Sequence, residues 1–186
     1  LDTKNVNIQN SYFYDINHDL NSQGHILYNK KETAQITFSN CLFMKNPNSV
    51  NPIDFQSTGK IFLLEGGIGT TLLIQNSVLT VNGFQTSEDY FYVQSGGEII
   101  LKNSLINVSI PSSYNRENNI IQKSPLFCGI SWDEIFYPAQ DRFEINENLT
   151  VFKPTMNVKV AANSPLIGAA SDGGNIAGAI NNCQAI

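Results

Sequence analysis

Cysteine is scarce in this sequence, and its scarcity limits the kinds of domain the chain can form. The three cysteines are Cys41, Cys128 and Cys183. An odd and sparse set of cysteines does not make the disulfide framework of a small cross-linked domain. We expect Cys41 to be a buried thiol, as free cysteines usually are.

Positive charge is also in short supply. Lysine and arginine together number 11 against 16 acidic residues, for a net charge of −5 and a pI of about 4.9. Such a balance argues against a nucleic-acid partner, whose phosphates need neutralising. An acidic polysaccharide would need calcium or a local basic patch to bind.

Long apolar runs are missing as well. No stretch approaches the roughly 18 apolar residues of a membrane span, so we expect none. The chain is nevertheless 41% hydrophobic and only 15% charged, which suits strands that hide one face. With 186 residues it can bury a sizeable core as one domain, 1–186.

An internal repeat organises the first part of the chain. Four similar segments read "VNIQNSYFYDI", "ITFSNCLFM", "LLIQNSVLTV" and "IILKNSLINV". Each carries an asparagine, with apolar residues four and two before it and three after it, and a small residue directly after it. The apolar period of two predicts strands, and the interval of 27 to 36 residues between asparagines favours a solenoid. The asparagines are Asn10, Asn40, Asn76 and Asn103.

The asparagine has a conformational role in this interpretation. Its short side chain tolerates the left-handed backbone conformation that bends one strand into the next. Stacked repeats would also place the four asparagines over one another, where their amides exchange hydrogen bonds as a structural ladder.

A further strand precedes three of the asparagines, in "GHILYNK", "GKIFLLEGG" and "DYFYVQSGG". Each coil then reads as strand, short turn, strand, asparagine bend, strand and long loop. In this order the sequence resembles the right-handed parallel β-helix proteins of the pectate-lyase-like superfamily. The tail segments "NNIIQKSPLF", "DRFEI" and "ANSPLIGAASDGGNIAGAI" look like the closing part of such proteins.

The resemblance implies an all-β, single-stranded right-handed parallel β-helix (solenoid). It would have about four coils over residues 1–110 and an irregular closing segment over 111–186. Relatives of this fold are mostly exported, so it also implies a secreted, cell-surface or periplasmic protein. We expect the chain to be a piece of a longer one, because it begins inside a repeat and solenoids need end caps. An uncapped first coil could contact another domain or another copy.

Catalytic residues are hard to find on the predicted strands. β-helix lyases use a lysine or arginine base with calcium or basic residues at the uronate, yet the only arginines, Arg116 and Arg142, lie outside the repeats. Hydrolases need facing carboxylates, and no aspartate cluster recurs. The remaining candidates are interpreted as a solvated turn with a neighbouring histidine: Lys30, Lys31, Glu32 and His25.

Metal ligation is not predicted. The loop around His18, with Asp15 and Asp19, matches no known ligand spacing. Glu65 and Asp89 make no better case for calcium. No cofactor is expected, although a lyase could use calcium.

An outward aromatic stripe is the most specific binding feature. If Ile26, Ile61 and Phe91 point inward, together with Tyr28, Leu63 and Val93, then Leu27, Phe62 and Tyr92 point outward. Aromatic rings on a flat sheet bind the apolar faces of sugars. The alternative is that long loops or missing domains cover the stripe. The predicted ligand-binding residues are Phe62, Tyr90, Tyr92, Lys60 and His25.

Two hypotheses follow from these patterns. The first is a non-catalytic carbohydrate-binding or structural domain of an exported, bacterial surface protein, with a polysaccharide or cell-surface glycan as partner. The second is the C-terminal portion of a polysaccharide lyase or glycoside hydrolase. We favour the first, because the acid, base and neutralising groups are missing from the predicted strands.

Overall fold

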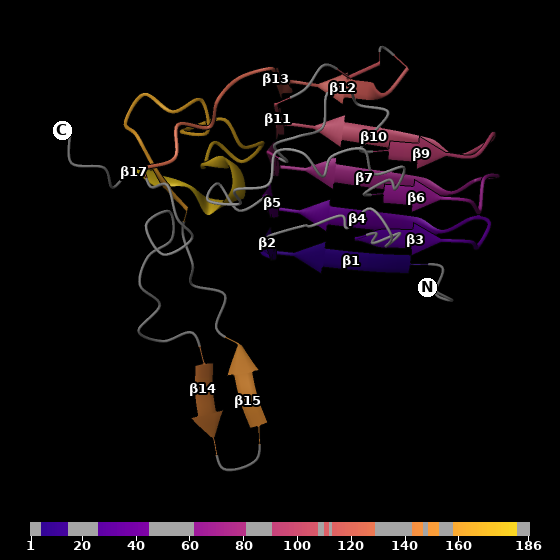
Figure 1. The fold of residues 1–186 in the computed structure, drawn as a ribbon, viewed down its shortest axis with the longest axis horizontal. Helices are drawn as coiled ribbons and strands as arrows, with labels where there is room; N and C mark the ends of the chain where they lie inside the picture. The colour runs from indigo at the N-terminus through magenta and orange to yellow at the C-terminus, as the bar shows by residue number, and fades with distance from the viewer. Residues whose placement is uncertain are drawn as a thin grey trace, which may run out of the picture.

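The computed structural model describes most of the repeats and part of the C-terminal third, namely residues 5–14, 26–44, 62–80, 91–107, 110–111, 113–128, 143–146, 149–152 and 158–181. Within these ranges the chain is all-β, with one short 3₁₀ turn, η2 (Ile176–Gly178). Three parallel sheets dominate the arrangement, and their strands come in turn from successive repeats (Figure 1). The predicted parallel strands are therefore confirmed.

The first sheet contains the strands that lead into the asparagine bends. Its order is β1-β4-β7-β10-β12, and neighbouring strands pair in parallel without a register shift between equivalent repeat positions. Alternate residues point into the core because successive side chains on a strand point to opposite faces. The strands are β1 (Asn5–Gln9), β4 (Gln35–Ser39), β7 (Thr71–Gln75), β10 (Glu98–Lys102) and β12 (Asn115–Glu117).

The second sheet begins directly after each bend. Its order is β13-β11-β8-β5-β2, again with parallel pairing. Phe13, Phe43, Leu79, Ile106 and Ile121 occupy one register position and contribute to the interior. The strands are β2 (Tyr12–Tyr14), β5 (Leu42–Met44), β8 (Val78–Thr80), β11 (Leu105–Ile106) and β13 (Ile120–Ile121).

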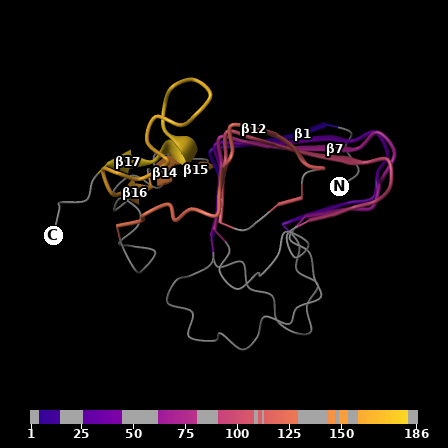
Figure 2. The same ribbon diagram turned by 90° about the horizontal axis from the view of Figure 1, so that it is seen from above.

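The third sheet is shorter and has the order β3-β6-β9. Its strands, β3 (Leu27–Asn29), β6 (Phe62–Leu64) and β9 (Phe91–Val93), precede the first-sheet strands of the same repeats. Seen from above, equivalent strands of successive repeats lie over one another (Figure 2).

One apolar core receives side chains from all three sheets. Phe38, Phe43 and Phe62 come from the first, second and third sheets in that order, and all three are fully buried. Phe62 packs edge-on against the other two and stacks on Phe91 of the next repeat, with ring centroids 5.4 Å apart. Stacked and edge-on aromatic pairs bring a stabilisation beyond their buried area.

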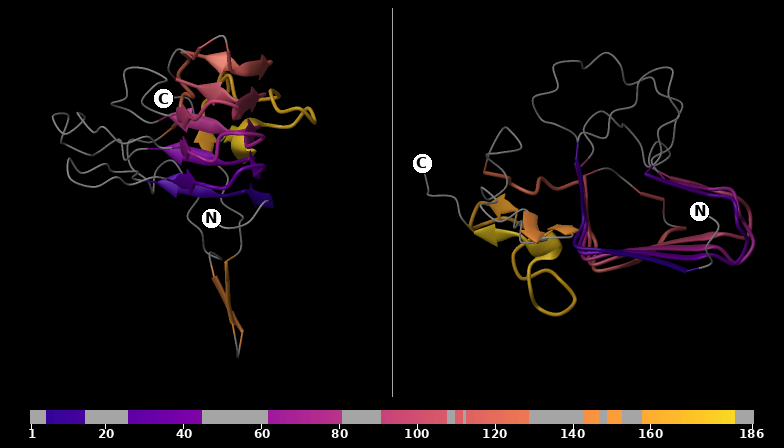
Figure 3. Two further views of the ribbon diagram at one scale, coloured as in Figure 1. Left: turned by 90° about the vertical axis from the view of Figure 1, so that its right-hand side faces the viewer. Right: turned by 90° about the horizontal axis from the view of Figure 1, so that it is seen from below.

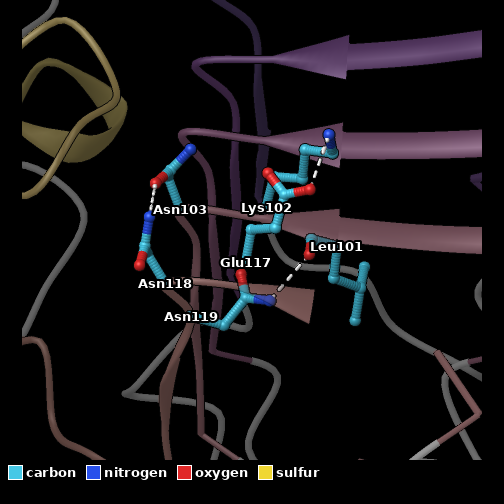
Figure 4. Close-up of polar contacts among 6 residues, drawn as sticks. All are labelled: Leu101, Lys102, Asn103, Glu117, Asn118 and Asn119. Carbon is cyan, nitrogen blue, oxygen red and sulfur yellow. Dashed lines mark hydrogen bonds and ion pairs between the residues drawn. The ribbon is translucent and has the colours of Figure 1, made fainter. Parts of the chain in front are cut away.

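A fifth, short repeat extends the stack beyond the four predicted ones. Strands β12 and β13 lie within residues 111–186, the region expected to close the fold. Lys102 and Glu117 form an ion pair of 3.2 Å between the fourth and fifth repeats, beside the Asn118–Asn103 hydrogen bond (Figure 4). The repeat pattern was not recognised here because this repeat is short and, among the residues described before β12, has no third-sheet strand.

The remaining described elements belong to the C-terminal third. An antiparallel pair is formed by β14 (Phe143–Asn146) and β15 (Leu149–Phe152), and a parallel pair by β16 (Lys159–Val160) and β17 (Ile180–Asn181). The segment 158–181 lies beside the second sheet (Figures 2 and 3). It shares a second apolar cluster with that sheet's outer side chains.

The cysteines differ from expectation in one respect. Cys41 is free and buried, whereas Cys128 takes part in a disulfide. The sparse cysteines therefore supply a cross-link that their number did not predict, because pairing depends on spatial proximity rather than on spacing. Within the described part of the chain, no helix is long and apolar enough to cross a membrane.

Candidate functional site

The asparagine bends connect the first sheet to the second in every repeat. Asn10, Asn40, Asn76 and Asn103 have φ values of 50°, 56°, 49° and 44°, and Asn118 of the fifth repeat has 53°. The left-handed region is costly for most residues and accessible to asparagine. The backbone N–H of each of the first four donates to the strand end of the next repeat, as from Asn76 to the Lys102 carbonyl at 3.1 Å.

The amide ladder is interrupted in its middle. Asn40 donates to Asn10 at 2.6 Å, and Asn118 donates to Asn103 at 3.3 Å. Asn76 does not bond to its neighbouring asparagines; it donates to Ser171 Oγ and accepts the Ser171 backbone N–H, both at 3.0 Å. The predicted continuous ladder is wrong at this repeat, because segment 158–181 reaches the bend and satisfies its amide.

The small residues after the asparagines form a row of hydrogen bonds of their own. Ser77 Oγ donates to the Gln75 carbonyl and accepts the backbone N–H of Cys41 from the preceding repeat. Ser104 shows the same arrangement in the next repeat. The fifth repeat replaces the serine with Asn119, which accepts from the Ser104 N–H and donates to the Leu101 carbonyl (Figure 4). These hydrogen bonds therefore link neighbouring repeats at the residue directly after each asparagine.

The outer face of the third sheet carries the candidate binding surface. Tyr28, Leu63 and Tyr92 occupy one register position on three adjacent strands, and we call them the open row. Tyr28 is 38% exposed and Tyr92 is 44% exposed, while Leu63 between them is half-buried. Two amphipathic rings thus flank an aliphatic side chain on one face of a parallel sheet.

The predicted stripe is wrong at Phe62 and Leu27. Both side chains point into the core, and Phe62 is fully buried. In the third of these strands the prediction is correct, since Phe91 points inward and Tyr92 outward. In the two preceding repeats the inward and outward positions lie one residue later than predicted, so that Tyr28 and Leu63 point outward.

Alternation cannot tell the two faces apart where adjacent side chains are both large and apolar, as at Phe62 and Leu63. Packing of the Phe62 ring in the core decides its direction. The turns between the third and first sheets cover residues 30–34, 65–70 and 94–97, which differ in length. The glycines allow the longest turn to pack tightly, since a Cβ at Gly66 would overlap the carbonyl oxygen of Lys31.

Two charged residues extend the open row into the adjacent turns. The Tyr28 hydroxyl donates to Glu65 Oε2 at 2.8 Å, which links neighbouring repeats. Lys30 Nζ lies 4.8 Å from the centroid of the Tyr28 ring. The hydrogen bond and charge interaction with Tyr28, followed by the nearby Glu65 carboxylate, raise the pKa of the fully exposed Lys30. Both charged groups are thereby oriented toward one tyrosine.

The other predicted site residues fall into two groups. Lys31 and Glu32 are exposed in the same turn as Lys30, as expected for a solvated turn. The residues outside the described ranges are His25, Lys60 and Tyr90, together with the metal candidates Asp15, His18, Asp19 and Asp89. Across the described ranges, no group of three His, Cys, Asp or Glu side chains could hold a metal ion.

Sequence reasoning missed a second outward row. Tyr12, Leu42, Val78, Leu105 and Ile120 share one register position on the outer face of the second sheet, and we call them the covered row. Leu42, Val78 and Leu105 are fully buried against segment 158–181. Apolar residues at the position two after each asparagine were the available signal, because an outward apolar position in several repeats requires cover.

Comparisons of the chain with protein-family models, with curated proteins and with solved structures gave no match.

Proposed function

We propose that the chain is a right-handed parallel β-helix, similar to the pectate-lyase-like superfamily, with coils formed by the three sheets. Two observations support this fold: successive repeats supply successive strands of every sheet, and left-handed asparagines join the first sheet to the second. Crossover connections between parallel strands are right-handed in nearly all proteins.

Within that fold, we propose a non-catalytic carbohydrate-binding function for the open row, with a polysaccharide or cell-surface glycan as ligand. The observation that carries it is the exposure of Tyr28 and Tyr92 at the same register position, two strands apart. Strands in a sheet are spaced by about 4.8 Å, so the two rings lie roughly 10 Å apart along the stack. Such a platform accepts successive sugars, each ring contributing on the order of 1 kcal/mol.

An exported location is part of the same proposal. The disulfide at Cys128 supports it, because disulfides persist mainly in oxidising compartments. The protein would then present the open row at a cell surface or outside the cell.

The test is a titration of oligosaccharides into the wild type and into the double variant Tyr28→Ala with Tyr92→Ala, observed by ligand-detected NMR. We expect the double variant to lose most of the binding. Ile68→Ala is the matched control, since Ile68 is 65% exposed but lies in the turn outside the open row. Equal binding by all three proteins would remove the proposed function.

The alternative, a portion of a polysaccharide lyase or hydrolase, is tested with the same material. We expect the wild type to release no unsaturated product from pectate, alginate or chondroitin. Product that accumulates with the wild type and is lost in Lys30→Ala with Lys31→Ala would favour the enzyme instead.

A further inference from the structure

The charged groups beside the open row bear on which glycans it would accept. Glu65 directly follows β6, so its carboxylate belongs to the middle of the three strands that carry Tyr28, Leu63 and Tyr92. The Tyr28 hydroxyl donates to one oxygen of this carboxylate, Oε2. An ionised carboxylate has about four acceptor positions, so Glu65 can also accept hydroxyl donors from a ligand on the platform.

The lysines beside the open row do not make this surface net positive. Lys30 and Lys31 are offset in number by Glu32 and Glu65 in the same two turns, and all four are exposed. Lys30 is further engaged with the Tyr28 ring and lies near Glu65. A site for a polyanion needs uncompensated cationic groups at the anions, and this balance does not provide them.

The ammonium of Lys30 also affects how a sugar can lie on Tyr28. Because Nζ lies 4.8 Å from the centroid of that ring, a sugar on Tyr28 would share the ring with this ammonium, whereas Tyr92 offers a 44% exposed side chain two strands away. A sugar between Tyr28 and Tyr92 would then approach the Glu65 side of the platform.

We propose that the open row, with Glu65 at its centre, selects neutral hydroxyl-rich glycans over uronate polymers. The proposal rests on the carbohydrate-binding function given above and names its ligand class. The ring faces supply the contact to the sugar, Glu65 accepts its hydroxyls, and the same carboxylate repels a uronate. Repulsion between two like charges about 4 Å apart in water lowers the binding affinity roughly five-fold relative to a neutral contact.

The experiment compares hexasaccharides of one length at one ionic strength. Neutral probes are the unsubstituted hexamers of glucose, xylose and mannose, and the acidic probe is hexagalacturonate. Ligand-detected NMR would measure their affinities for the wild type, Glu65→Gln and Glu98→Gln. Glu98 is exposed at the start of β10 in the first sheet, so Glu98→Gln removes one negative charge away from the open row. Circular dichroism would check that each variant is folded.

We expect at least one neutral hexamer to bind the wild type more tightly than hexagalacturonate does. Glu65→Gln should reduce that preference by about five-fold, while Glu98→Gln leaves it unchanged. Equal affinities for neutral and acidic probes in the wild type, or a preference unaffected by Glu65→Gln, would overturn the selectivity but leave the platform intact. Failure of every hexamer to bind the wild type would remove the carbohydrate-binding function itself, and the selectivity with it.

Discussion

The second and third sheets each present an outward row of large side chains, but the two rows have opposite surroundings. In the covered row, Leu42, Val78 and Leu105 are fully buried beneath segment 158–181. In the open row, Tyr28 and Tyr92 remain exposed. The difference follows side-chain chemistry. Leucine and valine gain only from removal from water, whereas a tyrosine hydroxyl can interact with water or with a ligand while the ring offers apolar area.

The contrast also shows how a repeat protein distributes its faces. Most interior positions of the first four repeats are apolar, and the outward positions decide what each face contacts. An aliphatic outward row needs another part of the chain to cover it, and here segment 158–181 provides that cover. An aromatic outward row flanked by charges is compatible with a reversible ligand.

Truncating one side chain in each row should give the largest difference in the free energy of unfolding. We expect Leu105→Ala to lower the free energy of unfolding by about 2 to 5 kcal/mol, the usual cost of a cavity in a packed cluster. Leu63→Ala in the open row should cost less than about 1 kcal/mol, since that side chain is only half-buried. Urea unfolding measures both. Equal losses would mean that the cover contributes little to stability.

The junction between the covered row and the bends should give the next largest effect. Asn76→Ala is expected to cost about 1 to 3 kcal/mol, because it strains a left-handed residue and removes the two bonds to Ser171. Asn76→Gly keeps the backbone conformation accessible and loses only those bonds, so it should cost less.

Thermal unfolding of Asn76→Ala, Asn76→Gly and Ser171→Ala separates the two terms. The Ser171 variant retains its backbone N–H and should be the mildest of the three. A midpoint unchanged in all of them would contradict a role for this contact in holding segment 158–181.

Alkaline pH should weaken the covered row through Tyr12. Burial, and secondarily the charge interaction with Cys41, raises the pKa of Tyr12 from 10.0 to about 12. The folded protein therefore holds the phenol proton more tightly than the unfolded chain does. Its stability contribution is fully present below pH 10 and is lost as the pH rises toward 12, by up to about 2 kcal/mol.

Chemical denaturation at a series of alkaline pH values measures this loss. Tyr12→Phe should flatten the decline between pH 10 and 12, whereas Tyr92→Phe in the open row should retain it, because Tyr12 is still present. An identical decline in wild type and Tyr12→Phe would assign it to other groups.

The smallest predicted effect lies beneath the open row. Asn29 ends β3 with its side chain buried, and both of its polar side-chain atoms lack a hydrogen-bond partner within the described structure. It shares its register position with Leu64 and Val93. Asn29→Leu should therefore raise the free energy of unfolding by about 1 kcal/mol, since replacing an unsatisfied polar group by an apolar one is neutral or stabilising.

Thr80→Val is the comparison in the second sheet, where the Thr80 hydroxyl is buried and likewise lacks a partner among the described residues. We expect a smaller gain there, because only one polar atom is removed. Destabilisation by Asn29→Leu in urea unfolding would show that the amide has a structural partner after all.

Much of the fold could be predicted because the repeats are local patterns. The alternation around each asparagine identified the first-sheet and second-sheet strands, and the left-handed backbone at Asn10, Asn40, Asn76 and Asn103 agrees with asparagine's conformational preference. The candidate site was harder to predict. Tyr92 was placed correctly, but Phe62 points inward and Tyr28 outward, because alternation does not distinguish adjacent large side chains and core packing decided between them.

What the sequence alone determined is the first-sheet and second-sheet strands of the first four repeats and the bends between them, since both depend on residues within a few positions of one another. Alternating apolar residues favour the extended backbone, and asparagine tolerates the left-handed backbone conformation. The tertiary structure decided which of two adjacent positions faces outward on the third sheet, because that choice depends on how Phe62 packs against Phe38, Phe43 and Phe91. It also decided that Ser171 meets Asn76 across 95 residues of chain. No local periodicity encodes such a contact. It forms because segment 158–181 covers Leu42, Val78 and Leu105, and the sequence of that segment does not indicate where it packs against them.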